Sequence, residues 1–169
     1  MANAKPEHLT HLRGSILIDK TSAIIAFRGE LDLLECEVLL SATQITHAAA
    51  PATITALDEI ATLCSTILRC EVTEEPLHFA GLLGCTSDEL RDQSHHPQKY
   101  FGSAHRRPQR SDGVVALWLQ RLRALARKVE LSAIRAFYTD EKISRPDIIL
   151  ALNRLSSALY ILSLKESAV

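Results

Sequence analysis

Two arginines and a glutamate, Arg123, Arg127 and Glu130, carry the most specific chemistry in this sequence. Because they stand at positions i, i+4 and i+7, an α-helix would place all three side chains on one face. Two guanidinium groups on one face can hold a polyphosphate through bidentate hydrogen bonds, with Glu130 orienting one of them. The same spacing is also typical of a solvated ladder of ion pairs. Spacing alone therefore leaves both interpretations open.

A second unusual polar position is Asn153, which lies among core leucines in the segment from Leu152 to Leu155. Asparagine is a mediocre helix former because its amide competes for backbone hydrogen bonds. In the middle of a helix its donor and acceptor can serve a base or a ribose, or they can be satisfied by a neighbouring helix. Again the sequence leaves the two alternatives open.

Histidines and cysteines raise the question of a metal. His8 and His11 form a His-x-x-His pair, and His95 is followed directly by another histidine. A metal site needs three or four converging ligands, and spacing along the chain does not show convergence. The four cysteines form no Cys-x-x-Cys pair, which favours buried free thiols over a zinc site or disulfides. Whether His8, His11 or His95 binds a metal is left open.

Most of the chain shows helical periodicity, so helices are expected to position these side chains. Apolar residues recur every three or four positions in four long segments, roughly 22–47, 51–70, 113–138 and 146–165. Pro51 suits the first turn of a helix, Thr86 to Glu89 form a capping box, and Ser144 is expected to cap the last helix with Asp147 reaching back. Short apolar runs such as Ile16 to Ile18 are the only candidate strands. The sequence predicts an all-α protein, an up-and-down bundle of about five helices in one domain over residues 1–169.

One stretch breaks the helical pattern. Residues 94–112 hold two prolines, three histidines and four Lys or Arg residues, which predicts a long loop. Connections between helices in bundles commonly take about 2–8 residues, so a loop of this length is expected to be either a functional lid or disordered.

Bulk composition excludes several classes of protein. The 169 residues are 47% hydrophobic and 23% charged, with a formal net charge of −1, so no strong field favours nucleic acid or an anionic membrane. No apolar run is expected to reach the length needed to cross a bilayer, and the N-terminus lacks the apolar core of a signal peptide. We therefore expect a cytoplasmic protein.

Three segments resemble a known family. Ser144-Arg145-Pro146-Asp147-Ile148, followed by Ala151-Leu152-Asn153-Arg154-Leu155-Ser156-Ser157, is similar to the C-terminal helix of ATP:corrinoid adenosyltransferases of the ethanolamine-utilisation type. The segments 90–100 and 5–12 resemble that type as well, in matching order along nearly the whole chain. The arginine and glutamate motif, and the twelve-residue spacing of Lys20 and Asp32, resemble the related propanediol-utilisation type.

The resemblance implies a reaction and its site residues. It implies transfer of the 5′-deoxyadenosyl group of ATP to the cobalt of cobalamin, with triphosphate as the leaving group and Mg²⁺ as its counterion. The implied ATP-binding residues are Lys20, Thr21, Arg127, Glu130 and Asn153, of which Arg127 and Glu130 act in catalysis. His95, His96, Tyr100 and Phe101 are the residues expected to face the corrinoid.

The resemblance also implies an assembly and a setting. The family forms homotrimers of helical bundles with sites between subunits, where the counterparts of Asp32 and Arg123 pair across the boundary. A corrinoid reductase is the expected protein partner, and a bacterial microcompartment is an alternative location to the open cytoplasm.

Two departures from the family keep an alternative function open. The Gly-rich phosphate-binding stretch of the propanediol type is absent, and His8, Thr10 and His11 stand roughly in its place. A Cys-rich metal motif, which often precedes the counterpart of Lys5 in the ethanolamine type, is absent too, as in a short or shortened member. A non-catalytic corrinoid or nucleotide carrier on the same bundle is therefore the alternative.

Overall fold

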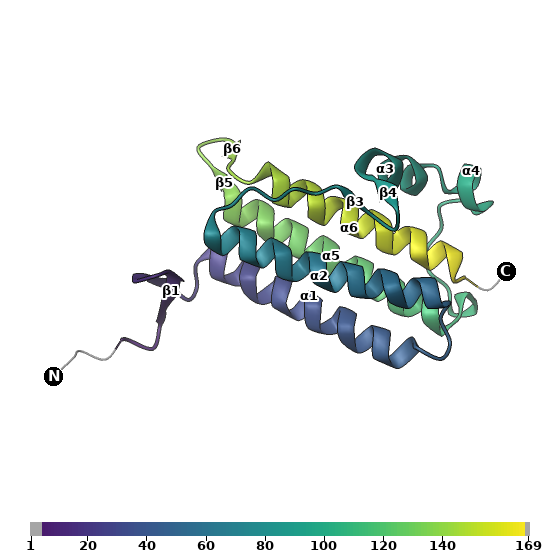
Figure 1. The fold of residues 1–169 in the computed structure, drawn as a ribbon, viewed down its shortest axis with the longest axis horizontal. Coiled ribbons are helices and arrows are strands. Elements are labelled where there is room, and N and C mark those ends of the chain that lie inside the picture. The colour runs from purple at the N-terminus through teal and green to yellow at the C-terminus, as the bar shows by residue number, and fades with distance from the viewer. Residues whose placement is uncertain (1–4, 168–169) are drawn as a thin grey trace.

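The computed structural model describes residues 5–167, and four long helices make up most of it (Figure 1). They are α1 (Ala23–Ile45), α2 (Pro51–Thr73), α5 (Val114–Phe137) and α6 (Pro146–Lys165). Helix α5 packs against both α1 and α6, and α1 also packs against α2. The all-α bundle predicted from the sequence is confirmed, with helix bounds within a few residues of those expected.

The core of the bundle comes from the apolar stripes of these helices. Phe27 on α1 and Phe137 at the end of α5 meet edge to face, with ring centroids 5.3 Å apart. An edge-to-face pair adds to the stabilisation from buried area alone. The largest fully buried side chains are Phe27, Leu31, Leu34, Ile45, Leu57, Ile60, Ile67, Leu90, Leu119, Leu122, Ile148 and Leu152.

Two shorter helices lie on the outside of α6. Helix α3 (Ser87–His95) packs along α6, and α4 (Pro97–Phe101) follows it after one residue (Figure 1). A 3₁₀ turn, η1 (Arg110–Asp112), then leads into α5. The prediction of one long loop over residues 94–112 is therefore wrong in part. Pro97 is the first residue of α4, so the prolines of this stretch do not all lie in a loop. Buried Asp112 stabilises η1, because it accepts hydrogen bonds from Arg106 at 2.5 Å and from the Gln109 N–H at 2.7 Å.

Three antiparallel hairpins complete the fold. Strands β1 (Leu9–Arg13) and β2 (Ile16–Asp19) precede the bundle, and Ile16–Ile18 form a strand as predicted. The other two hairpins have strands of only two residues, which are too short for a periodic pattern to reveal. They pair β3 (Gly81–Leu82) with β4 (Cys85–Thr86), and β5 (Tyr138–Thr139) with β6 (Lys142–Ile143).

Helix starts were predicted well at two sites and wrongly at a third. Pro51 occupies the first turn of α2, and Thr86 and Glu89 form the predicted capping box of α3. Ser144 does not cap α6: its hydroxyl donates to the Phe137 carbonyl at 3.1 Å, closing the β5–β6 hairpin. Asp147 instead accepts from the Leu77 N–H at 2.8 Å, because this helix start is tied to another segment of the chain.

One described helix, α6, has the length and mean hydropathy of a membrane span, although no such run was expected from the sequence. Within its apolar window 67% of the residues are buried inside the bundle. Its hydrophobicity is that of a core helix which α5, α3 and α2 surround on several sides.

Candidate functional site

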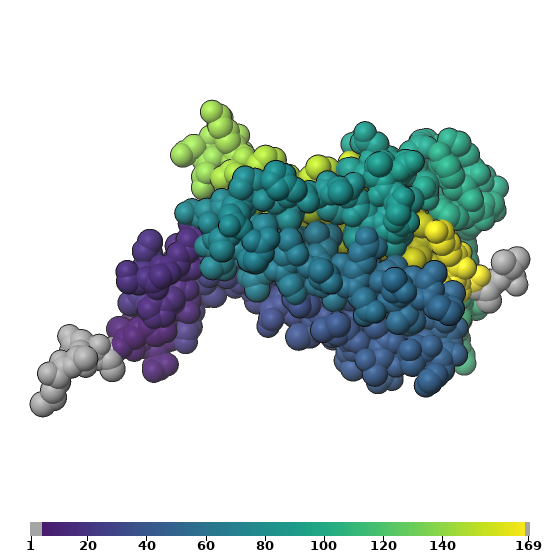
Figure 2. All heavy atoms as spheres, in the orientation of Figure 1, coloured from purple at the N-terminus to yellow at the C-terminus, as the bar shows by residue number. Residues whose placement is uncertain are grey.

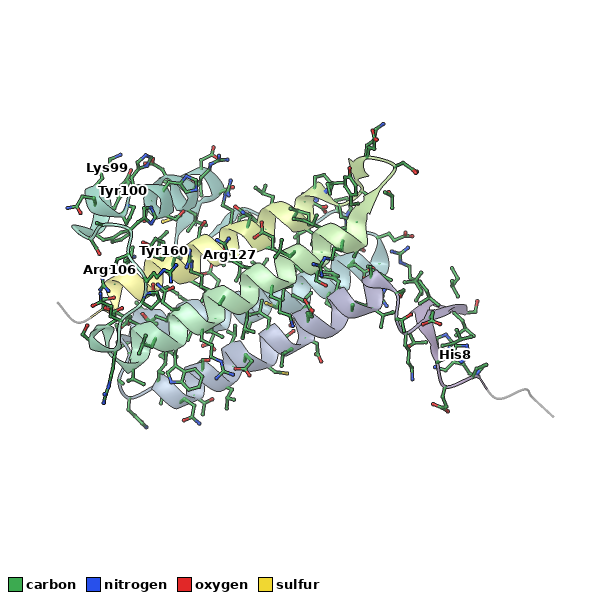
Figure 3. The ribbon with its side chains drawn as sticks, turned by 180° about the vertical axis from the view of Figure 1, so that it is seen from behind. His8, Lys99, Tyr100, Arg106, Arg127 and Tyr160 are labelled. Atoms are coloured by element: carbon green, nitrogen blue, oxygen red, sulfur yellow. The ribbon has the colours of Figure 1, made fainter. Side chains whose placement is uncertain are left out.

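A polar cavity of about 190 Å³ opens between α5, α6 and α3. Arg127 of α5 and Tyr160 of α6 lie along it, close to the segment that carries Arg106 (Figure 3). The cavity is lined by Ser94, His95, His105, Arg123, Arg127, Asn153, Ser156, Ser157 and Tyr160. The structure thus brings together Arg123, Arg127 and Asn153, which the sequence singled out on two separate helices.

The two arginines give this cavity a positive charge. The Arg123 guanidinium lies 4.8 Å from the centroid of the Tyr160 ring, and its Nη1 donates to Gln120 Oε1 at 3.4 Å. Burial lowers the pKa of Arg123, and the positive charge of Arg127 lowers that pKa further. Within residues 5–167 no carboxylate forms an ion pair with either arginine. Two like charges facing one cavity favour an anion there.

Glu130 lies beside the cavity but orients a different group from the one predicted. Its Oε1 accepts a hydrogen bond from Asn153 Nδ2 at 2.8 Å, so Glu130 orients the asparagine. The sequence analysis predicted that Glu130 would orient one of the two arginines. The Asn153 Oδ1 atom accepts from Arg154 Nη1 at 2.5 Å. One donor and one acceptor site of the amide are therefore fixed, and the amide plane is held by both neighbours. The second hydrogen on Nδ2 and the second lone pair on Oδ1 remain for a ligand.

Arg154 links this amide to α3. It is 6% exposed, and its Nε donates to the Ser87 hydroxyl at 3.0 Å. Burial lowers the pKa of Arg154, and nearby Arg91 lowers it as well. A cation buried this deeply requires hydrogen-bond partners, and Asn153 and Ser87 supply them. The start of α3 and the Asn153 amide are therefore coupled through one side chain.

Tyr160 is a site residue that the sequence analysis missed, and it contacts His105, one of the three histidines in residues 94–112. Their rings are nearly parallel, at 3°, with the Tyr160 hydroxyl 3.1 Å from His105 Nδ1. Burial raises the pKa of Tyr160, an effect that the charges of Arg123 and Arg106 oppose. A signal for Tyr160 was present, because Asn153, Ser156, Ser157 and Tyr160 follow the i, i+3, i+4, i+7 pattern of one helix face.

The four residues expected to face a corrinoid do not all line the polar cavity. His95 lines the cavity, and its carbonyl lies 3.3 Å from His105 Nε2. His96 and Tyr100 both contact Asp92: His96 Nδ1 lies 2.8 Å from its Oδ1, and the Tyr100 hydroxyl donates to its Oδ2. Phe101 is partly buried and packs against the bundle core. Only His95 of this set contributes to the cavity wall.

The remaining predicted site residues lie away from the cavity of their own chain. Lys20 and Thr21 are exposed at the end of the β1–β2 hairpin, where the Thr21 hydroxyl donates to Asp19 Oδ1 at 2.6 Å. Figure 3 shows His8, on the same hairpin, at the opposite end of the molecule from Tyr160. Asp32 is exposed on α1, which contributes no residue to the cavity lining. In the part of the chain that the structure describes, no three metal-binding side chains converge.

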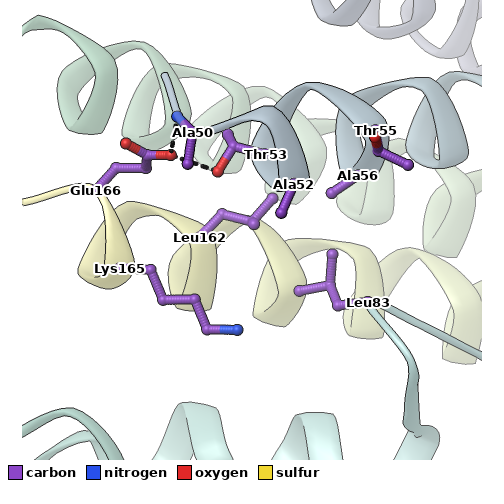
Figure 4. Close-up of a pocket in the computed structure, with 9 residues that line it drawn as sticks. All are labelled: Ala50, Ala52, Thr53, Thr55, Ala56, Leu83, Leu162, Lys165 and Glu166. Atoms are coloured by element: carbon purple, nitrogen blue, oxygen red, sulfur yellow. Dashed lines mark hydrogen bonds between the residues drawn. The ribbon is translucent and has the colours of Figure 1, made fainter. Parts of the chain in front are cut away.

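A larger cavity, of about 540 Å³, lies between the start of α2 and the end of α6 (Figure 4). Glu166 caps α2 there by accepting from the Ala50 N–H at 2.9 Å and the Thr53 hydroxyl at 2.5 Å. The rest of the wall is mainly alanine, leucine and threonine, with Lys165 as its cation. This cavity is larger, but it lacks a pair of guanidiniums that could hold a polyphosphate through bidentate hydrogen bonds.

Comparison with known proteins identifies the family of this chain. The family model for cobalamin adenosyltransferase matches residues 1–166. The chain belongs to this family. It is 32% identical over 165 residues to the corrinoid adenosyltransferase EutT of Salmonella typhimurium LT2, covering 97% of this chain and 60% of that protein. EutT of Escherichia coli K12 is also 32% identical, over 159 residues, covering 94% and 58%.

The chain spans about three fifths of the length of these curated relatives. Among solved structures, its fold matches a variant of a PduO-type ATP:corrinoid adenosyltransferase from Lactobacillus reuteri complexed with cobalamin and ATP. The TM-score is 0.70 over 90% of this chain and 87% of that one, at 16% identity. The helical bundle is therefore the fold of that enzyme, and the resemblance seen in the sequence motifs is confirmed at the level of the family.

Proposed function

We propose that this protein is an ATP:corrinoid adenosyltransferase, which transfers the 5′-deoxyadenosyl group of ATP to the cobalt of a reduced corrinoid. The observation that carries the proposal is the convergence of Arg123 and Arg127 with the Asn153–Glu130 pair at one polar cavity. Family membership supports it, and so do the names of the EutT relatives and the cobalamin and ATP held by the structural neighbour.

The reaction sets clear demands on such a site. Cobalt(I) attacks the 5′ carbon of ATP, a cobalt–carbon bond forms, and the carbon–oxygen bond breaks with its electron pair leaving on triphosphate. The cobalt is formally oxidised to cobalt(III), and no proton transfer is needed. Because the cobalt is already a strong nucleophile, the protein must align the two reactants and stabilise the leaving charge. Alignment can lower such a barrier by about 7–11 kcal/mol and charge stabilisation by about 3–4 kcal/mol.

Arg127 is the group best suited to the leaving charge. Its guanidinium is exposed at the cavity and forms no ion pair within the described residues, so its donors are free for phosphate oxygens. Arg123 adds a second positive charge from a fixed position over the Tyr160 ring. Mg²⁺ would arrive with the triphosphate of ATP, since the described part of the chain holds no cluster of three ligands for it.

The nucleoside end of ATP fits the amide side of the cavity. Glu130 and Arg154 hold the Asn153 amide in one orientation, which leaves one donor and one acceptor for the ribose or the base. Glu130 thus acts by positioning this amide. We assign the adenosyl end of ATP to Asn153 and the triphosphate end to Arg127, one helix away.

Lys20, Thr21 and Asp32 require a second subunit in this proposal. They lie outside the cavity of their own chain, so they can serve ATP only in the site of a neighbouring copy. A homotrimer, in which Asp32 of one chain pairs with Arg123 of the next, would bring them there. Exposed Leu33, next to Asp32 on α1, and exposed Leu40, about two turns further along, support burial of this side of the helix against another copy.

The corrinoid is assigned to the side of the cavity formed by the end of α3 and by His105. His95 is the predicted contact that lines the cavity, and His96, Tyr100 and Phe101 follow it along the chain. Cobalt must be reduced before transfer, for which we propose a corrinoid reductase as partner. We propose that the protein acts in the cytoplasm, either free or inside a bacterial microcompartment for ethanolamine utilisation.

An anaerobic assay with ATP, Mg²⁺ and cob(I)alamin tests the proposal directly. The absorbance of cob(I)alamin should fall in step with formation of adenosylcobalamin and triphosphate. A protein that binds ATP and the corrinoid without turnover would be a carrier, and the catalytic proposal would be wrong. If the protein bound neither ATP nor the corrinoid, the cavity would be a polar network with a structural role only.

A further inference from the structure

A buried acid at the far end of the bundle has no part in the cavity. Glu71, in the last turn of α2, has a fully buried side chain. Its Oε2 accepts from Arg28 Nε at 2.6 Å and its Oε1 from Arg28 Nη2 at 3.2 Å. A carboxylate without solvent contact costs several kcal/mol unless it is paired and hydrogen-bonded, and Arg28 of α1 provides both.

A second arginine joins this pair from outside the bundle. Arg13, at the end of β1, directs its Nη2 to Glu71 Oε1 and to the Glu71 carbonyl, both at 3.4 Å. Its Nη1 contacts the exposed Glu74. The four side chains form a network of two arginines and two glutamates with no net charge. We call Arg13, Arg28, Glu71 and Glu74 the arginine clamp.

The clamp is a main attachment of the β1–β2 hairpin to the helices. The hairpin projects beyond the end of the bundle (Figures 1 and 2). Ile16 and Leu17, on β2, are 58% and 40% exposed, so the strand that follows Arg13 contributes little apolar packing. An ion-pair network with one fully buried member can therefore decide the angle at which the hairpin stands.

Lys20 moves with this hairpin. Its backbone N–H donates to the His8 carbonyl at 2.9 Å, which extends the β1–β2 pairing by one step. Thr21 is fixed one residue later through Asp19. Any rotation of the hairpin about its attachment is thus passed on to the Lys20 side chain.

We infer that the arginine clamp positions the hairpin so that Lys20 reaches the triphosphate of ATP in the site of a neighbouring copy. The inference rests on the proposed function and names positioning residues for it: Arg13 and Glu71 act through Lys20 and touch no substrate. The clamp makes ATP affinity depend on the last turn of α2, at the opposite end of the molecule from the Tyr160 side of the cavity.

Arg13→Met is the decisive variant, because it leaves the Arg28–Glu71 pair intact and so preserves the buried charge balance of the bundle. We expect the KM for ATP to rise about tenfold, since a hairpin that is off by an ångström misplaces Lys20. The KM for cob(I)alamin and the melting temperature should stay near their wild-type values. Hydrogen exchange should become faster across residues 9–19.

Two further variants separate positioning from general stability. Arg13→Lys keeps one charged contact with Glu71 and should give a KM for ATP between those of wild type and Arg13→Met. Arg69→Met breaks an exposed pair with Glu75 at the same end of α2, at 2.5 Å, without touching the hairpin, and is the matched control. It should leave the KM for ATP unchanged.

The outcomes distinguish this inference from the function on which it rests. A wild-type KM for ATP in Arg13→Met, together with a clear defect in Arg127→Ala, would overturn the clamp and leave the transferase proposal intact. An equal rise in KM for Arg69→Met would reduce the clamp to an unspecific charge effect. Absence of ATP-dependent turnover in the wild-type protein would remove both.

Discussion

Replacing Arg127 by alanine is the sharpest test of the cavity, because the side chain combines a central position with a small structural role. It is exposed, and no hydrogen bond or ion pair holds it among residues 5–167. Truncation of such a surface residue changes the free energy of unfolding by no more than about 0.5 kcal/mol. A hydrogen bond to a charged phosphate contributes about 1.5–3 kcal/mol, so kcat/KM for ATP should fall about 10- to 150-fold.

The assay is the anaerobic loss of cob(I)alamin absorbance at varied ATP, with thermal unfolding measured in parallel. Arg135→Ala is the matched control, since Arg135 is an exposed arginine near the end of the same helix and outside the cavity. It removes the same charge from the protein and should retain wild-type kcat/KM. Equal losses in both variants would mean that only overall charge matters. Wild-type kinetics in Arg127→Ala would refute the assignment of the triphosphate to this cavity.

Three other results are expected. Burial opposes ionisation of Asp147, but hydrogen bonds from Arg145 and two backbone amides lower its pKa to about 2. Because the folded pKa lies below the usual value, this carboxylate stabilises the fold above about pH 4, and the contribution disappears as the pH falls towards 2. Asp147→Asn should therefore lose about 2 kcal/mol in urea unfolding at pH 7, and much less near pH 2. Light scattering should show a trimer whose activity falls in Asp32→Asn, with partial recovery when Asp32 and Arg123 exchange charges; an active monomer would contradict this. Added corrinoid should slow hydrogen exchange across residues 94–112 more than ATP does, and an unchanged KM for the corrinoid in Phe101→Ala would place the corrin wall elsewhere.

The helices could be predicted because the residues of each helix follow the periodicity of its buried and exposed faces. The stripe of α5 and the apolar face of α2 repeat with helical period, and Pro51 and the box at Thr86 mark helix starts through local chemistry alone. Ser144 failed as a cap for the opposite reason: its partner, the Phe137 carbonyl, lies across a hairpin. Sequence patterns predict a helix start when neighbouring residues form its cap. The start of α6 is instead fixed by contacts with distant segments, as the hydrogen bond from the Leu77 N–H to Asp147 shows.

The polar cavity was half predictable for the same reason. The spacing of Arg123 and Arg127 places both on one face of one helix, which is local information. That this face meets Asn153 depends on the packing of α5 against α6, and the addition of His105 depends on the path of the chain after α4. The sequence predicted that Glu130 orients an arginine on its own helix. In the structure it orients the amide of Asn153 on α6, and this contact depends on the packing of the two helices.

The features that sequence rules disfavour gather at this cavity and directly beside it. Within residues 5–167, Arg123 and Arg127 lie near each other without an ion-paired carboxylate, and burial lowers the pKa of Arg123. Arg154 is buried with only neutral hydrogen-bond partners. In a bundle selected for stability alone, apolar side chains at these positions would serve as well or better. Such local conflicts are expected where a site is organised for a ligand, because the ligand supplies the missing charge when it binds. In the proposed function, the triphosphate of ATP supplies negative charge opposite Arg123 and Arg127, the two arginines that line the cavity. The pair of guanidiniums at this cavity is therefore the strongest structural reason for the proposed ATP site.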